Sequence, residues 1–272
     1  MSWLTDPLSL EFFQRALLAA SLAALIAALV GTWVVIRGLS FMGDALAHGV
    51  LPGIALGVVL GFDLTLGAIV SAGAMVAGIN LVHSRSRLHE DTGIGLLFVG
   101  MLALGVVIIS RGGSYAGSLT GILFGDALGV TSGDVWILAI ALGIAAVASA
   151  TLYRGFLALS FNEQKAEMLG MRPRVVHTAM LALVTMAVVT SFSTVGTLLV
   201  FGLLVAPPAT ASLVARRVPA MMAVAAGVGV GSVIVGLLVS YHADTAASAT
   251  IAVVTVMAFF IVLASRPLWA RV

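Results

Sequence analysis

The sequence predicts an all-α integral membrane protein, a polytopic bundle of eight or nine transmembrane helices. Its composition is the first reason: 61% of the 272 residues are hydrophobic and 9% are charged, with a mean hydropathy of +1.19. A soluble domain carries about 25% charged residues. The second reason is uniformity, because no polar stretch is long enough to form a separate soluble domain. Residues 1–272 are therefore expected to form one transmembrane domain.

Composition and missing motifs also limit the possible partners and chemistry. A formal net charge of +2 gives no reason to expect nucleic acid as a partner. The sequence contains no cysteine, which excludes disulfides and thiolate metal ligands. It also lacks the phosphate-binding motif G-x-x-x-x-G-K-[ST], so the chain is not expected to hydrolyse ATP alone. The N-terminus has acids before its first arginine and no cleavage-like site, so the first apolar run is expected to remain a membrane span.

An apolar helix needs about 20 residues to cross a bilayer, and this length sets the expected spans. Pro52 interrupts the second span, and the boundary between the sixth and seventh is soft. Eight spans therefore remain an alternative to nine. The nine expected spans are 12–36, 42–61, 64–83, 94–110, 135–153, 175–194, 196–214, 220–241 and 245–265.

Basic residues predict the orientation of these spans, because they favour the cytoplasmic side of a membrane. They fall in alternate loops, whereas the opposite loops hold only Arg111. The C-terminus is therefore expected inside, and with nine spans the N-terminus is expected outside. The residues expected at the cytoplasmic side are Arg37, Arg85, Arg87, Arg154, Lys165, Arg172, Arg174, Arg216, Arg217, Arg266 and Arg271.

Two connecting segments are expected to be helical without crossing the membrane. Residues 117–130 have glycine at every fourth position from Gly117 to Gly129, which predicts a short outer or re-entrant helix packed closely on the bundle. Within the long cytoplasmic loop, about 155–174, the run NEQKAEMLG predicts a short amphipathic helix ended by Gly170 and Pro173. This second helix is either a solvated connector or a docking site for a cytoplasmic partner.

Asp44 and His48 lie inside the apolar second span and are the strongest candidates for function. Four residues of α-helix return two side chains to the same face, so the pair is close enough to hold one metal ion. An ionisable group at the centre of a membrane helix costs about 2.5–3.5 kcal/mol on insertion, so such groups usually line a polar path or a site. The spacing therefore predicts a metal site on a transport pathway.

The same span has a glycine stripe, formed by Gly49, Gly53 and Gly57, that would let another helix approach closely. Gly53 lies about 140° around the helix from His48, so one face is polar and another is built for packing. Pro52 removes a helix hydrogen bond and favours a kink beside the site. The plainer interpretation, a glycine-rich packing helix with two incidental polar groups, leaves the buried carboxylate unexplained.

Four stretches, in order along the chain, resemble a known family. RGLSFMGDALAHGVLPGIALG (37–57) resembles the signature of the ABC-3 family, the permease subunits of ABC-type zinc and manganese importers. The other three resemble its fourth-span region, its cytoplasmic coupling segment and its proline-containing late span. They are HEDTGIGLLFVGMLALG (89–105), NEQKAEMLG (162–170) and TVGTLLVFGLLVAPPATASLVARR (194–217).

This resemblance implies a type II-like ABC importer permease in the bacterial cytoplasmic membrane. The expected partners are a second permease copy in a homodimer, two cytoplasmic ATPase subunits that bind ATP, and an extracytoplasmic metal-binding protein. Asp44 and His48 would be the metal ligands, and no permanently bound cofactor is expected. The residues expected to couple the permease to the ATPase are Glu163, Ala166, Glu167 and Gly170.

Two copies of the chain about a two-fold axis would bring two Asp44 and two His48 together. Up to four oxygen and nitrogen ligands suit Zn²⁺ tetrahedrally or Mn²⁺ with added waters. The alternative is a stand-alone secondary transporter, which often has repeated halves. The C-terminal half contains no second copy of the Asp–His motif, which favours the ABC permease.

Overall fold

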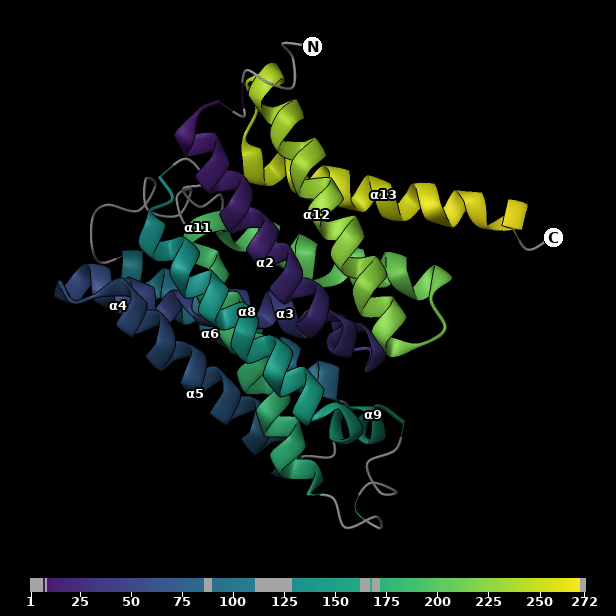
Figure 1. Cartoon of the computed structure of the whole chain (residues 1–272). Helices are drawn as coiled ribbons and strands as arrows, with labels where there is room; N and C mark the ends of the chain where they lie inside the picture. The colour runs from purple at the N-terminus through teal and green to yellow at the C-terminus, as the bar shows by residue number, and fades with distance from the viewer. Residues whose placement is uncertain are drawn as a thin grey trace.

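The computed structural model describes residues 9–85, 90–110, 129–161 and 172–269, together with Pro7 and Glu167. Within these ranges every regular element is an α-helix, and nine segments are long and apolar enough to cross a membrane. The predicted all-α polytopic fold is thus confirmed (Figure 1). The helices are α2 (Glu11–Ile36), α3 (Ser40–Gly49), α4 (Leu51–Leu60), α5 (Leu64–Arg85), α6 (Glu90–Ser110), α8 (Ser132–Thr151), α9 (Tyr153–Phe161), α11 (Pro173–Val214), α12 (Val218–Ala243) and α13 (Ala247–Trp269).

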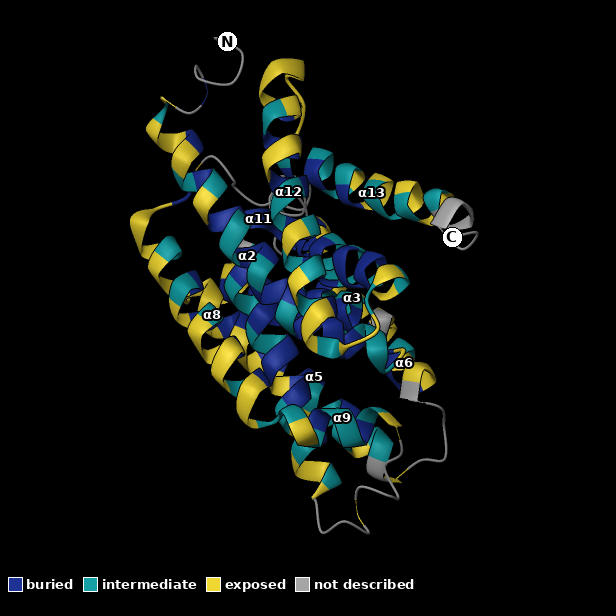
Figure 2. Ribbon diagram, turned by 45° about the vertical axis from the view of Figure 1, so that its right-hand side comes forward, coloured by how far each residue is buried: buried dark blue, intermediate teal, exposed yellow. Residues whose placement is uncertain are grey.

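Helix α2 forms the centre of the bundle and packs against α8, α11 and α12. Small side chains allow this, because alanines on several sides of α2 leave room for the neighbouring backbones. Figure 2 shows α2 largely in the colour of buried residues. The buried alanines are Ala16, Ala19, Ala20, Ala23, Ala24, Ala27 and Ala28.

The outer helices expose apolar side chains. On α8, Trp136 is 71% exposed and Val147 is 64% exposed, and on α13 Phe260 is 60% exposed. Figure 2 shows exposed residues along the length of both helices. Apolar surfaces this extensive are unfavourable in water and fit contact with lipid.

The predicted second span consists of two ten-residue helices, α3 and α4, which meet at Val50. Pro52 stands in the first turn of α4 and has no N–H to donate to the carbonyl of His48, four residues earlier. The hydroxyl of Ser71 on α5 donates to the next carbonyl, that of Gly49, at 2.8 Å. At the position of the expected kink the span is therefore divided at Val50, two residues after His48, although Val50 keeps helical dihedrals (φ −80°, ψ −18°).

The predicted glycine stripe faces helix α5 and brings the two backbones together. A Cβ on Gly53 would collide with the carbonyl oxygen of Gly67, and a Cβ on Gly67 would collide with that of Gly53. Gly49 packs against the side chain of Met75, also on α5. Because only glycine permits this approach, the hairpin of α4 and α5 depends on the stripe.

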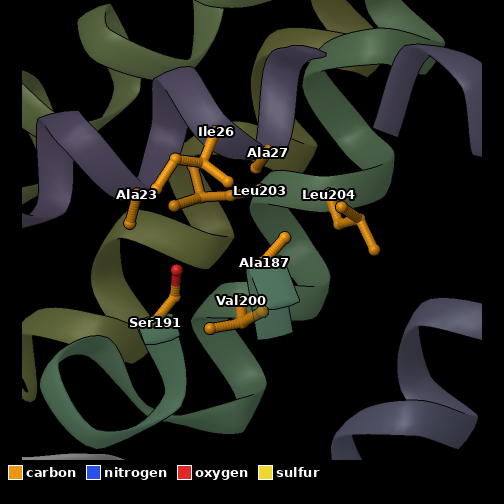
Figure 3. A pocket seen from close by; sticks show the side chains of 8 residues that line it. All are labelled: Ala23, Ile26, Ala27, Ala187, Ser191, Val200, Leu203 and Leu204. Atoms are coloured by element: carbon orange, nitrogen blue, oxygen red, sulfur yellow. The ribbon is translucent and has the colours of Figure 1, made fainter. Parts of the chain in front are cut away.

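Helix α11 covers the sixth and seventh predicted spans without the expected loop between them. Gly196, with φ 78° and ψ 158°, interrupts its helical backbone, which places the soft boundary at a kink. Glycine is required there because an L side chain rarely adopts such a positive φ. Beside the kink, Ser191 and Val200 from the two halves of α11 face Ala23 of α2 around a cavity of about 10 Å³ (Figure 3).

Helix α9 was not expected as a separate element. It follows α8 after a single residue, Leu152, and its Phe156 is fully buried against Trp33 of α2, with ring centroids 5.3 Å apart. Helix α9, the end of α5 and the beginning of α11 lie at the same end of the bundle (Figure 1). Residues 117–128 of the predicted outer helix and most of the predicted coupling helix lie outside the described residues.

Candidate metal site

Asp44 and His48 lie next to each other on α3, as their spacing predicts. The Nε2 atom of His48 is 3.4 Å from Oδ1 of Asp44, and the two side chains are 20% and 26% exposed, respectively. An imidazole nitrogen and a carboxylate oxygen therefore face a shared, partly open space. Phe41, one turn earlier, shares this face and is also exposed.

The opposite face of α3 holds the pair in place. Met42, Ala45 and Leu46 are buried in the main core. A Cβ on Gly43 would collide with the side chain of Leu204 on α11, so α3 fits tightly against that helix. Since the apolar face is fixed in the core, Asp44 and His48 must point away from it.

Aromatic rings from α6 and α3 support the imidazole. The ring of Phe98 meets His48 edge-on with centroids 5.6 Å apart, and it meets Phe41 in the same way at 5.3 Å. The Nδ1 atom of His48 is buried and has no hydrogen-bond partner among the described residues. The imidazole is thus oriented mainly by packing.

A single copy of the chain brings together two side chains, Asp44 and His48, that could bind a metal at this place. Among the described residues there is no group of three or more His, Cys, Asp or Glu side chains that could hold a metal ion. Structural zinc sites use four ligands and catalytic sites three plus water. Within the described residues the pair on α3 alone would make only a partial metal site, which water or a second chain would have to complete.

Ser71 is a positioning residue that sequence reasoning missed. It is 6% exposed, and its hydrogen bond to the Gly49 carbonyl fixes the backbone directly after His48 to helix α5. A serine inside an apolar helix opposite a proline-broken neighbour is the signal that points to such a bond. Of the predicted coupling residues, Glu167 is exposed, whereas Glu163, Ala166 and Gly170 lie outside the described part of the chain.

Comparisons with known proteins agree on one family. The model of the ABC 3 transport family matches residues 9–266. The manganese transport system membrane protein MntC of Listeria monocytogenes is 34% identical, over 98% of this chain and 95% of that protein. The chelated iron transport system membrane protein YfeD of Yersinia pestis is 32% identical, over 96% of this chain and 88% of that protein.

A solved structure agrees with the fold over nearly the whole chain. PsaBC from Streptococcus pneumoniae, in complex with Fab, superposes with a TM-score of 0.83 at 32% sequence identity. The match covers 96% of this chain and 94% of the other. Sequence and structure therefore point to the same relatives.

Proposed function

The chain belongs to the ABC 3 transport family, and from this premise we propose that it is the permease subunit of an ATP-driven importer for divalent transition metals. Mn²⁺ is the preferred cargo in this proposal and Zn²⁺ the alternative. The observation that carries the proposal is the Asp44–His48 pair, 3.4 Å apart and partly open, on a helix that ends one residue later at Gly49. Relatives named for manganese transport support Mn²⁺.

The ligand chemistry agrees with this class of cargo. A carboxylate and an imidazole suit borderline and hard divalent cations, and the sequence has no cysteine to favour Cu(I). A conduit must bind its ion weakly enough to release it. Two protein ligands per chain, on a face that stays partly open, fit transient binding of this kind.

A homodimer would complete the site. A two-fold axis beside the exposed face of α3 would bring together two Asp44 and two His48 side chains. Four ligands of this kind would serve Zn²⁺ in a tetrahedron, or Mn²⁺ with added waters. Among the residues that the structure describes, no group of three or more candidate metal ligands occurs, which supports this part of the proposal.

The remaining parts of the importer would be separate chains. Two cytoplasmic ATPase subunits would bind ATP and dock on the segment about 155–174 through Glu163, Ala166, Glu167 and Gly170. An extracytoplasmic metal-binding protein would deliver the ion from the other side. In this arrangement the permease resides in the bacterial cytoplasmic membrane with its C-terminus inside, and it is not itself an enzyme.

Metal uptake by cells that carry the complete transporter tests the proposal. Uptake of Mn²⁺ is measured alone and in competition with Zn²⁺ and Fe²⁺, with a wild-type ATPase and with one that cannot hydrolyse ATP. We expect saturable uptake that stops with the inactive ATPase. Uptake that continues unchanged would instead identify a stand-alone secondary transporter.

Docking of the ATPase has its own test. Ala166→Pro should break the coupling helix, because proline costs about 3 kcal/mol in a helix interior. ATPase pull-down and transport should fall together, while metal binding to the isolated permease survives. Glu163→Lys should act in the same direction, and Glu11→Lys, at the exposed start of α2, is the matched charge-reversal control. Normal pull-down and transport by Ala166→Pro would make the loop a simple connector.

A further inference from the structure

The outer face of α8 carries an apolar groove of about 630 Å³. Residues three and four positions apart share one side of a helix, and the groove follows such a stripe. It is hollow in the middle because a Cβ on Gly143 would meet nothing within 4 Å, whereas Ile140 and Val147 beside it project outward and are exposed. The lining of the groove includes Ile140, Gly143, Ile144, Val147, Thr151 and Leu152.

The length of the groove matches one leaflet of a bilayer. Helix α8 has 20 residues, enough to cross the whole hydrocarbon core of about 30 Å. The groove occupies only the second part of α8, from Ile140 to Leu152. At a rise of 1.5 Å per residue this distance is about 18 Å, close to the thickness of half the core, about 15 Å. An acyl chain of a single leaflet would therefore fit along it.

An exposed arginine stands directly beyond the end of the groove. Arg154 is two residues after Leu152 in the sequence, in the first turn of α9. The joint is short and ordered, because Leu152 donates a backbone hydrogen bond to Ala148 and accepts one from Phe156. Among the described residues none forms an ion pair or a hydrogen bond with the guanidinium of Arg154. A positive charge thus lies where the headgroup of a lipid in the groove would be.

Two further arginines extend this positive charge at the start of α11. A Cβ on Gly155, the residue after Arg154, would lie 3.1 Å from Cγ2 of Val176, so α9 packs against the first turns of α11. Arg172, which precedes α11, and Arg174, in its first turn, are both exposed. Glu167, in the loop between α9 and α11, is also exposed. The lining of the groove itself contains no charged residue.

The groove lies apart from the face on which a second copy of the chain would complete the metal site. Helix α8 packs against α2, α9 and α11. Helix α6, which begins with Glu90 and Asp91, packs against α3, α4 and α5 instead. Figure 2 shows α8 on the left and α3 and α6 on the right. A two-fold axis beside the exposed face of α3 would therefore leave the groove on α8 facing the membrane lipid.

We propose that the α8 groove and Arg154 form a binding site for an anionic phospholipid of the cytoplasmic leaflet. One acyl chain lies along the stripe over Gly143, and the phosphate contacts Arg154. Arg172 and Arg174 strengthen the attraction, since clusters of basic residues on the cytoplasmic side select anionic headgroups. The site goes beyond the proposed metal transport and takes from it only the orientation of the chain.

Native mass spectrometry of the purified full-length chain, without metal or ATPase, tests the charged end of the site. The chain in detergent is titrated with phosphatidylglycerol and with phosphatidylcholine that have the same acyl chains. We expect phosphatidylglycerol to bind more tightly, and Arg154→Gln to weaken its binding about fivefold, which corresponds to about 1 kcal/mol. Arg154→Lys should keep most of the preference, and Arg216→Gln, at an exposed arginine between α11 and α12, should behave as the wild type. Equal affinity for the two lipids, or unchanged binding by Arg154→Gln, would overturn the proposal.

Filling the hollow tests the apolar end. Gly143→Leu should weaken the binding of both lipids about fivefold, and Val147→Trp should act in the same direction if Gly143→Leu does not fold. Gly227→Leu, on α12, where a Cβ also meets nothing within 4 Å, is the matched control. Unchanged lipid binding with a changed dimer fraction would show that a second copy covers the groove and would overturn the proposal. Displacement of the lipid by glycerol phosphate, which lacks acyl chains, would also overturn it, because the site would then bind any anion.

Discussion

Prolines occur inside two membrane-spanning segments, at Pro52 in one and at Pro207 and Pro208 in the other. Each proline leaves the carbonyl four residues earlier without a helical hydrogen-bond donor. The two segments differ in what surrounds these carbonyls. Pro52 leaves the carbonyl of His48 without a helical donor, and the span is divided at Val50 into α3 and α4, although Val50 keeps helical dihedrals. Pro207 and Pro208 leave the carbonyls of Leu203 and Leu204 without a helical donor, yet α11 continues through both prolines. Proline alone therefore does not decide whether a membrane helix breaks.

The two regions differ in what lies in the turns before each proline. Leu203 and Leu204 are 1% exposed, and a Cβ on Gly31 of α2 would collide with the Leu204 carbonyl oxygen. The backbone of α2 thus lies close against the carbonyl that Pro208 leaves without a helical donor. At Pro52 the adjoining residues are also buried and Gly105 of α6 packs against the backbone, but the preceding turns carry Asp44 and His48, which are partly open. The tight packing of α11 against α2 contributes to stability, whereas α3 keeps an accessible polar face.

The largest expected effect is on metal uptake, which should depend on the α3 region and not on the α11 region. His48→Ala should reduce metal uptake more than about 100-fold, the upper end of losses seen when even outer-shell partners of a metal are removed. Its thermal unfolding should stay close to wild type, because the side chain is not part of the buried core. Leu204→Ala should do the opposite: it should cost about 2–5 kcal/mol of stability while the remaining folded protein still binds metal. Uptake near wild type in His48→Ala would remove the functional difference.

Close backbone contacts give the next largest effect and should be similar in both regions. Gly31→Leu and Gly53→Leu each force a side chain into a neighbouring carbonyl, so each should destabilise the purified protein by about 1–3 kcal/mol, as overpacking does. Gly73→Leu is the matched control, because a Cβ there meets nothing within 4 Å. Equal melting temperatures for Gly53→Leu and Gly73→Leu would show that the stripe is not needed for packing.

The smallest effect concerns the prolines themselves. Pro52→Ala restores the N–H that can bond to the His48 carbonyl, a gain of about 1 kcal/mol for one hydrogen bond. We expect it to join α3 to α4, raise thermal stability slightly and lower uptake several-fold, because the break beside the site is lost. Pro208→Ala should leave uptake unchanged, since α11 already continues through this proline. Equal uptake by both variants would mean that the break serves no purpose in transport.

Much of this fold is predictable from sequence, because membrane spans follow from apolar length alone. The spans and the polar and packing faces of α3 and α4 were predicted, since side chains four residues apart define both faces. The kink at Gly196 was predicted only as a soft boundary between two spans. A glycine in the sequence does not by itself indicate that the backbone adopts a positive φ there.

Contacts between distant residues could not be predicted. Arg37 was interpreted as a marker of orientation, and its bond to His177 spans 140 positions of sequence. Helix α9 was missed because its nine residues are too few to show a clear period beside the charged loop. The bond from Ser71 to Gly49 likewise depends on the packing of α5 against the broken helix.

Mn²⁺ uptake by Asp44→Asn, measured beside Asp63→Asn in cells with the complete transporter, tests the central claim most directly. Asparagine keeps the shape of each side chain and removes its charge. Asp63 accepts a hydrogen bond from the Leu66 backbone at the start of α5, a cap that asparagine can also provide. The proposed site predicts that uptake is lost in Asp44→Asn and retained in Asp63→Asn, with both proteins present in the membrane in normal amounts. Normal uptake by Asp44→Asn would contradict it, because a site for a divalent cation in the membrane cannot lose its only anionic ligand on α3 without effect.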